Sequence, residues 1–229
     1  MPSVGVVIPA GGRGVRFGGR IPKQFQILGG LPILRTTVAI FHSLKEVSEV
    51  VVVVPPANVV SVSREMARAG LTKVTAVVPG GRERQGSVRN GLMSFKNRPD
   101  IVLVHDAVRP LVSPATIRQV IRSAQKGGAA VVGVRLQDTI KTEYPRGFYQ
   151  KTLDRSNLWA VQTPQGFRYD VLLKAHQKAN RDRFTGTDES SLVERLGIAV
   201  RIVEGDERNF KITTRRDLEL AKILMKRRK

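Results

Sequence analysis

Residues 4–24 read Val-Gly-Val-Val-Ile-Pro-Ala-Gly-Gly-Arg-Gly-Val-Arg-Phe-Gly-Gly-Arg-Ile-Pro-Lys-Gln, an apolar run that passes into a loop rich in glycine and arginine. The β-branched run Val4–Pro9 is typical of a strand buried on both faces of a parallel sheet. Small residues in the loop let the backbone approach a ligand, and successive N–H groups can line an anion site. The stretch predicts a buried first strand that opens into an anion-binding loop.

A strand-then-helix pattern continues along the rest of the chain. Five consecutive valines predict a second buried strand at 50–55. Further strands are predicted at 73–79, 101–105, 129–134, 159–163 and 199–203, and helices at 32–43, 58–69, 85–95, 114–126, 169–179, 189–196 and 215–226. The alternation predicts an α/β fold, with a mostly parallel sheet and helices on both faces.

Ligands bind to such sheets beyond the carboxyl ends of the strands. Four loops are therefore candidates for a site, those beginning at Pro9, Pro79, His105 and Val134. Residues 138–154 interrupt the pattern with alternating residues around a Pro-Arg-Gly turn, which predicts a two-stranded arm that leaves the sheet. No linker or repeat divides the chain, so residues 1–229 are expected to form one domain.

Charge is the unusual feature of the composition. Thirty-nine Lys and Arg face nineteen Asp and Glu, a formal net charge of +20, and residues 1–45 contain no acidic residue. Such an excess favours anionic partners: nucleic acid, an acidic membrane surface or phosphorylated small molecules. A nucleic-acid-binding module is thus an alternative from another functional class. Aromatic residues are only 5%, and no basic strand with interleaved aromatics or recognition helix is evident, so we expect no nucleic-acid partner.

The cellular context follows from two further features. The chain has no cysteine, which excludes a disulfide framework and a cysteine-ligated zinc site and suits a reducing compartment. The apolar run Val4–Ile8 is too short for a signal peptide or a membrane span, and no basic region precedes it. We expect a soluble, cytoplasmic protein with no membrane partner.

The first loop carries four cations within eleven positions: Arg13, Arg16, Arg20 and Lys23. They would repel one another unless an anion lay between them, and a triphosphate is the natural candidate. Two familiar glycine-rich patterns do not fit. The dinucleotide fingerprint fails because Phe17 stands where its third glycine belongs, and the P-loop pattern fails because Gly19 is followed by Arg-Ile.

Two further loops carry groups suited to a nucleotide. After the strand at 73–79, Gly80-Gly81 leads into a helix, and Ser87 adds a hydroxyl that could hold a base or sugar. After the strand at 101–105, Asp106 is placed to bind a divalent cation or a ribose hydroxyl, with turn or helix capping as the alternative. The neighbouring His105 is interpreted as a hydrogen-bonded core residue.

Polar strings beyond residue 135 supply arginine, lysine and hydroxyl groups, the inventory for binding a phosphorylated polyol. They are Asp138-Thr139-Ile140-Lys141, Asp154-Arg155-Ser156-Asn157-Leu158-Trp159, Gln162-Thr163-Pro164-Gln165, Thr187-Asp188-Glu189-Ser190 and Asn209-Phe210-Lys211-Ile212-Thr213. Each string also has a simpler interpretation, and Thr187-Asp188 could merely cap the helix that follows.

In this order, the strings resemble the 2-C-methyl-D-erythritol 4-phosphate cytidylyltransferase family over nearly the whole chain. The resemblance is carried by Pro-Ala-Gly-Gly and Pro-Lys-Gln in the first loop, and by His-Asp-Ala-Val-Arg-Pro, Asp-Arg-x-x-Leu-Trp, Thr-Pro-Gln, Thr-Asp-Glu and Lys-Ile-Thr. It implies a Rossmann-like nucleotidyltransferase fold with a protruding β-arm. It also implies a homodimer in which the arm, at about 136–157, helps to form the neighbour's active site.

The resemblance also implies roles for individual residues. CTP would be bound by Ala10, Gly11, Gly12, Gly81, Ser87, Asp106 and Ala107. Arg16 and Lys23 would stabilise the transition state, and Arg155 and Lys211 would position the phosphate of the acceptor. The acceptor pocket would comprise Arg109, Thr139, Arg155, Thr163 and Thr187. Asp106 would also bind Mg²⁺, or another divalent cation, together with the CTP phosphates. Arg82 and Asp206 receive no role.

The implied reaction joins CTP to a phosphorylated polyol and releases pyrophosphate. An acceptor phosphate oxygen would attack the α-phosphorus in line, and a dianionic phosphate monoester needs no general base. Cations and Mg²⁺ would then carry the catalysis by stabilising charge. The nearest alternative is a ribitol-5-phosphate cytidylyltransferase, which shares the CTP loops, and a broader one is a sugar-phosphate nucleotidyltransferase that uses UTP or ATP.

Overall fold

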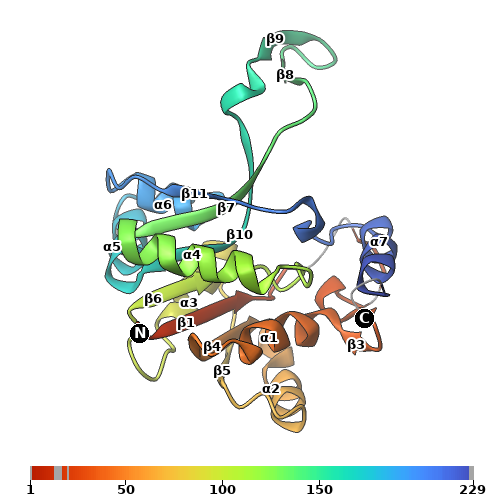
Figure 1. The fold of residues 1–229 in the computed structure, drawn as a ribbon, viewed down its shortest axis with the longest axis vertical. Helices are drawn as coiled ribbons and strands as arrows, with labels where there is room; N and C mark the ends of the chain where they lie inside the picture. Colours follow the sequence, from red (N-terminus) through yellow and green to blue (C-terminus); the bar gives the residue numbers. More distant parts are fainter. Residues whose placement is uncertain (1, 13–16, 20, 227–229) are drawn as a thin grey trace.

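A computed structural model describes residues 2–12, 17–19 and 21–226, and its centre is a seven-stranded sheet (Figure 1). Across the sheet the strands follow the order β11-β7-β10-β6-β1-β4-β5. Their bounds are β1 Val4–Pro9, β4 Val47–Val54, β5 Val74–Pro79, β6 Ile101–Val104, β7 Ala129–Arg135, β10 Trp159–Arg168 and β11 Arg201–Glu204. Neighbours pair in parallel except for β10, which runs antiparallel to both β6 and β7. The predicted α/β fold with a mostly parallel sheet is confirmed.

Helices cover both faces of this sheet. They are α1 Ile33–Ser43, α2 Val59–Arg68, α3 Arg84–Leu92, α4 Pro114–Gly127, α5 Tyr169–Arg181, α6 Glu189–Glu194 and α7 Arg215–Lys226. Side chains of α1, α2 and α4 share one buried cluster with the strands, and those of α3, α5 and α6 share the cluster on the other face. Within the described residues, no helix has the length and apolar character needed to cross a bilayer.

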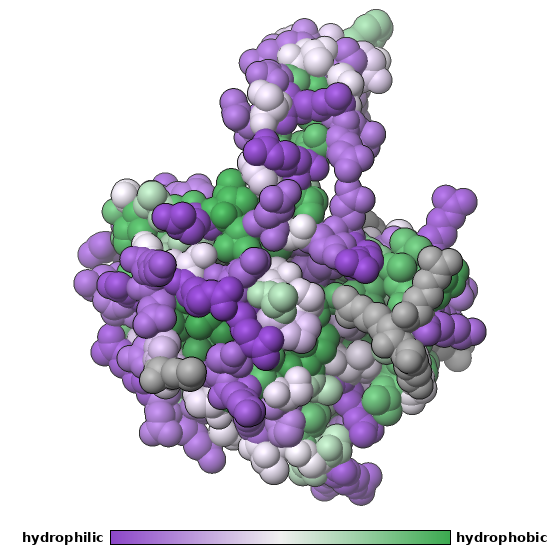
Figure 2. All heavy atoms as spheres, viewed as in Figure 1, coloured by the Kyte–Doolittle hydropathy of each residue, from purple (hydrophilic) through white to green (hydrophobic). Residues whose placement is uncertain are grey.

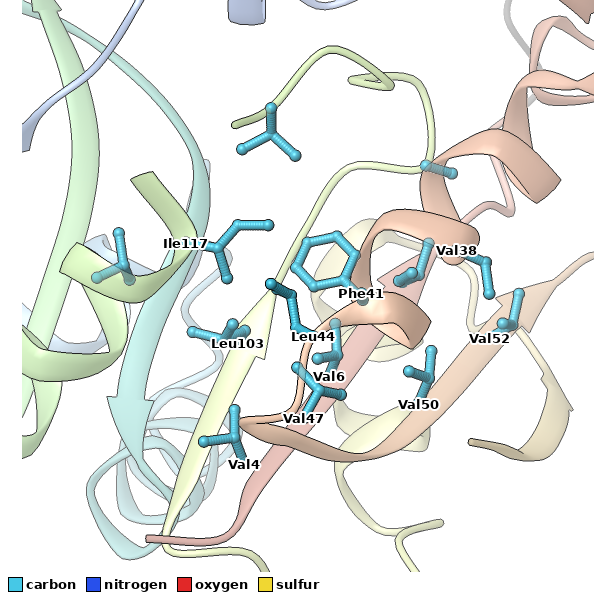
Figure 3. Packing of buried hydrophobic residues seen from close by; sticks show 14 of the residues in the cluster. Val4, Val6, Val38, Phe41, Leu44, Val47, Val50, Val52, Leu103 and Ile117 are labelled. Atoms are coloured by element: carbon cyan, nitrogen blue, oxygen red, sulfur yellow. The ribbon is translucent and has the colours of Figure 1, made fainter. Parts of the chain in front are cut away.

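The two-residue period of the strands explains why both faces are apolar. Along β1, Val4, Val6 and Ile8 point into the first cluster, whereas Val7 points into the second. Figure 3 shows side chains of α1, including Val38 and Phe41, packed over this first face of the sheet. A continuous run of β-branched residues therefore buries itself on both sides, as the sequence predicted.

A third, smaller core lies under the C-terminal helix α7. Leu218 and Ala221 of α7 pack with Phe17 of the first loop and with Val108 and Ile212 of two later loops. The two-residue strands β2 (Ile27–Leu28) and β3 (Leu31–Pro32) pair beside it, and Leu28 is part of this core. Three segments that carry predicted site residues are thus joined by one apolar cluster.

The predicted arm is present. Strands β8 (Ile140–Glu143) and β9 (Tyr149–Leu153) pair antiparallel and project away from the body of the protein (Figure 1). The surface of the arm is mostly hydrophilic in Figure 2, although Tyr144, Phe148 and Tyr149 are strongly exposed. Short 3₁₀ helices occur at Lys23–Phe25, Pro56–Asn58, Arg155–Asn157 and Glu207–Asn209.

Several predicted elements begin or end up to three residues away from the observed ones, and two further differences involve prolines. The strand predicted at 159–163 continues to Arg168, and its pairing with β7 shifts between Gln162 and Gln165. The shift accommodates Pro164, which has no N–H to give to a ladder in the middle of a sheet. Pro32 was expected at the first helical position of α1 but lies one residue earlier, at the N-cap.

Candidate active site

A cleft of about 710 Å³ opens at the carboxyl ends of β1, β4, β5 and β6. It is lined by segments 9–12, 22–24, 80–84 and 106–108, together with Pro55, Pro56, Asn58, Ser87 and Lys211. All seven residues predicted to bind CTP line the cleft: Ala10, Gly11, Gly12, Gly81, Ser87, Asp106 and Ala107. Lys23 and Lys211 line it as well. Arg16 lies outside the described residues, so its role stays a prediction.

A buried glutamine holds the start of the first loop. Gln24 is 2% exposed, and its Nε2 donates to the carbonyl oxygen of Ala10 at 2.7 Å and to that of Gly12 at 3.4 Å. The Ala10 N–H in turn donates to the Val53 carbonyl of the neighbouring strand at 2.6 Å. The two ends of the glycine-rich turn are thereby fixed to the sheet, and Lys23, next to Gln24, is presented to the cleft.

The second loop is closed by its own serine. Ser87 Oγ accepts a hydrogen bond from the Gly81 N–H at 3.1 Å and donates to the Glu83 carbonyl at 3.0 Å. A Cβ at position 81 would lie 2.9 Å from the Gly86 carbonyl carbon, so a larger residue would force the backbone apart. Both residues line the cleft, and their predicted contacts with CTP stay predictions.

Asp106 is the electrostatic centre of the site. Its side chain is largely buried, and its oxygens lie 2.9 Å from Lys211 Nζ, 3.4 Å from Arg109 Nε and 3.7 Å from Arg84 Nε. Burial acts to raise the pKa of Asp106, but Lys211, Arg84 and Arg109 together hold this pKa well below its usual range. The residue therefore stays ionised. Its carboxylate is thus engaged by three side-chain cations, and its predicted contact with a divalent cation or a ribose stays a prediction.

Thr163 and His105 form a buried hydrogen-bonded chain that begins at the backbone of Asp106. Thr163 Oγ1 accepts from the Asp106 N–H at 3.0 Å and lies 3.1 Å from His105 Nδ1, while His105 Nε2 lies 3.1 Å from the Arg109 carbonyl oxygen. Burial lowers the pKa of His105 to about 4, so its ring is neutral. The core role predicted for His105 is confirmed. The Thr163 hydroxyl is engaged in this framework, and its predicted contact with the acceptor stays a prediction.

The loop that carries Lys211 is fixed by a buried asparagine. The side-chain Nδ2 of Asn209 donates to Gln162 Oε1 and to the Thr163 carbonyl, both at 2.9 Å. The backbone carbonyl of Asn209 accepts from Arg109 Nη1 at 2.7 Å. These contacts bring Lys211 next to Asp106 from about a hundred residues further along the chain. Arg109 is almost fully buried within this framework and does not line the cleft, so its predicted contact with the acceptor stays a prediction.

Three further residues predicted to bind the acceptor do not line the cleft: Thr139, Arg155 and Thr187. Thr139 and Arg155 lie exposed at the base of the arm, outside the cleft of their own chain, and Arg155 donates to the Gln137 carbonyl. Thr187 is exposed in the loop before α6. Asp188 caps α6 by accepting from the Ser191 N–H at 2.9 Å, which confirms the capping interpretation for Asp188, whereas the predicted contact of Thr187 with the acceptor stays a prediction.

The cleft offers a limited fit for a divalent cation. Among the described residues, no group of three or more His, Asp or Glu side chains is arranged to hold a metal ion. Two carboxylates, Asp106 and Glu83, line the cleft. Mg²⁺ is often bound by only one or two carboxylates together with substrate phosphates and water. The residues present therefore fit a cation held mainly by a bound triphosphate, with Asp106 as a protein ligand.

Sequence and structure comparisons place this architecture among known proteins. The sequence profile described as "2-C-methyl-D-erythritol 4-phosphate cytidylyltransferase" matches residues 4–227. The curated protein of that name from Pelotomaculum thermopropionicum is 43% identical over 230 residues, covering 100% of this chain and 96% of the relative. The one from Symbiobacterium thermophilum is 46% identical, covering 97% of this chain and 92% of the relative. The crystal structure of the protein of that name from Thermus thermophilus is 36% identical, with a TM-score of 0.78 and coverage of 98% of this chain and 99% of that chain.

Proposed function

The chain belongs to the 2-C-methyl-D-erythritol 4-phosphate cytidylyltransferase family, and we propose from this membership that it joins CTP to 2-C-methyl-D-erythritol 4-phosphate and releases pyrophosphate. The observation that carries the proposal beyond the family name is the cleft itself. A glycine-rich turn, two lysines and an ionised Asp106 among three cations meet there at the carboxyl ends of the strands. This is the chemistry expected of a site for a triphosphate and a phosphomonoester.

The mechanism follows from the charges in the cleft. An oxygen of the acceptor phosphate attacks the α-phosphorus of CTP in line, the bond from this phosphorus to the bridging oxygen breaks, and pyrophosphate leaves. The attacking phosphate is already ionised, so the protein supplies positive charge in place of a general base. Lys23 and Lys211, which both line the cleft, supply that charge, and Arg16 is expected to add to it.

Magnesium or a similar divalent cation completes the proposed chemistry. When bound, it neutralises charge on the CTP phosphates. Asp106 is its proposed protein ligand. Because Lys211, Arg84 and Arg109 keep the pKa of Asp106 low, this residue offers a carboxylate throughout the physiological pH range. We place the reaction in the cytoplasm, where CTP is available.

A homodimer is the proposed assembly. Thr139 and Arg155 lie outside the cleft of their own chain, so their predicted contacts with the acceptor require the arm of a second copy. Tyr144, Phe148 and Tyr149 near the tip of the arm supply exposed apolar surface for such a contact. Light scattering should therefore report a dimer, and deletion of the arm should give a monomer that binds CTP but not the acceptor.

Pyrophosphate release tests the reaction. The protein would be assayed with CTP and Mg²⁺ in parallel with 2-C-methyl-D-erythritol 4-phosphate and with ribitol 5-phosphate, and then with UTP and ATP in place of CTP. Turnover with methylerythritol phosphate and CTP alone is expected. Turnover with ribitol 5-phosphate alone would keep the nucleotide site but change the acceptor, and turnover with UTP or ATP would change the nucleotide. If no pyrophosphate were released with any pair of substrates, the proposed nucleotidyltransferase activity would be refuted, and nucleic-acid binding would again have to be considered.

A further inference from the structure

We propose that Gln85 and Arg84, at the start of α3, are positioning residues that hold the segment 184–189, which carries Thr187, against the loop that begins the nucleotide-binding part of the cleft. The inference rests on the proposed function, because it takes Thr187 as an acceptor contact. Residues 83, 84 and 85 are consecutive, and the side chain of each bonds to the segment 184–189 on either side of Thr187. They follow directly on the Gly80-Gly81 turn of the nucleotide side.

Gln85 makes the most specific of these contacts. Its Nε2 donates to the Phe184 carbonyl at 3.1 Å, and its Oε1 accepts from the Gly186 N–H at 2.9 Å. One side-chain amide thus pairs with two backbone groups of the loop, much as a neighbouring strand would. A Cβ at position 186 would lie 2.4 Å from Ser191 Oγ, so the backbone is pressed closely onto α6 at this point. The conformation of the residue before Thr187 is therefore fixed from both sides.

Arg84 fixes the other side of Thr187. Its Nη1 lies 2.8 and 2.6 Å from the two carboxylate oxygens of Glu189, the first residue of α6, which is 1% exposed. A buried ion pair seldom adds net stability relative to apolar packing, and fixing one geometry is the better-attested use of such pairs. The Nε of Arg84 lies 3.7 Å from Asp106, so the same guanidinium joins the acceptor loop to the centre of the nucleotide site.

The geometry divides these residues by role. Arg84 lines the cleft, whereas Gln85 does not. Gln85 therefore influences a bound acceptor only through the loop it holds. Its substitution should weaken acceptor binding while leaving CTP binding intact, a division that a general loss of stability does not produce.

Gln85→Met tests the proposal, because methionine keeps the length and helix propensity of glutamine but cannot make either hydrogen bond. We expect the KM for methylerythritol phosphate to rise about tenfold, the effect of losing two neutral hydrogen bonds. The KM for CTP should stay within about twofold, since Ser87 and the glycine turn are untouched. Hydrogen exchange in the peptide that contains residues 184–188 should become faster in the variant without any substrate.

Ser94→Ala is the matched control. Ser94 donates to the Asn90 carbonyl at the far end of α3, so its removal costs one hydrogen bond of the same helix without touching the loop. Both KM values and the exchange of 184–188 should then match the wild type. If Gln85→Met does not fold, Thr185→Val removes the 3.2 Å bond to Glu83 Oε2 from the exposed side, with the same expected direction in both readouts.

The outcomes separate the two proposals. Wild-type protein without turnover would refute the proposed function, and the exchange measurement would still report on the loop. An active wild type with an unchanged acceptor KM in the variant would overturn the positioning role. Equal rises in both KM values, with a lower thermal midpoint, would overturn it as well, since they would indicate a general structural role.

Discussion

Replacing His176 by leucine should stabilise the protein, and increasingly so as the pH falls. His176 is 1% exposed and lies on α5, whose buried residues Leu172, Ala175 and Ala179 belong to the second core cluster. Neither ring nitrogen has a hydrogen-bond partner among the residues that the structure describes. Burial, reinforced by Arg89 and Arg84, lowers the pKa of His176 from 6.5 to about 4. The folded protein therefore resists the protonation that the unfolded chain accepts readily.

The size of the effect follows from this shift. Because the pKa is lower in the folded state, the unfolded chain binds the proton first, and stability is lost as the pH falls from 6.5 towards 4. A fall in the pKa of His176 from 6.5 to about 4 corresponds to about 3 kcal/mol of unfolding free energy below pH 4, of which about 2 kcal/mol is lost by pH 5. Above pH 7, leucine should still gain about 1–3 kcal/mol, the cost of a buried polar group without a partner.

Urea unfolding at about pH 8, 6.5 and 5 measures both the gain in stability that depends on pH and the gain that remains above pH 7. The His176→Leu variant should be the more stable protein at each pH, and the difference should widen by about 2 kcal/mol between the first and last conditions. His105, whose pKa is also about 4, titrates in both proteins and cancels in the comparison. Parallel pH profiles for the two proteins would refute the reasoning, because they would mean that His176 does not resist protonation in the folded state.

Three further predictions concern the cleft. Lys23→Ala should lower turnover about 10²–10⁴-fold with an unchanged thermal midpoint, and near-normal turnover in steady-state assays would remove Lys23 from the mechanism. Lys211→Met should lower kcat/KM by about 10²-fold or more, with partial recovery in Lys211→Arg, and equal activities of these two variants would show that the charge is not what matters. Gln24→Leu should raise the KM for CTP about tenfold by releasing the Ala10 and Gly12 carbonyls, and an unchanged value in CTP titrations would contradict this role.

Local pattern was sufficient to predict most elements of the fold. Val50–Val54 could hardly be anything but a buried strand, and glycines 70 and 128 end α2 and α4 where a left-handed residue is needed. The direction and place of β10 could not be predicted. Apolar periodicity is the same for parallel and antiparallel strands, and the partners of β10 in β6 and β7 are set by the whole topology.

The residues that line the site could be predicted from the sequence, but the contacts that position them could not. Asp106 and Lys211 stand in recognisable strings, and the structure brings them together. The supporting role of the residues that hold them in place was not predicted, although several of these residues stand in the same strings. Gln24, Asn209 and the Arg84–Glu189 pair act through contacts to backbone groups or to residues up to 105 positions away, and a buried glutamine has no local signature that separates it from a surface one. Burial of a polar side chain becomes visible only once the chain is folded.

The arm begins and ends at two residues that already face each other. Arg135, the last residue of β7, is paired in register with Trp159, the first of β10, and the Arg135 guanidinium lies 4.5 Å from the centre of the Trp159 ring. The two attachment points are thus one strand spacing apart, roughly 5 Å. A two-residue hairpin turn spans that gap. Topologically, β7 and β10 form an ordinary hairpin, and the arm is an extension inserted at its tip. A change in the length of the arm would therefore leave the register of the central sheet unaltered.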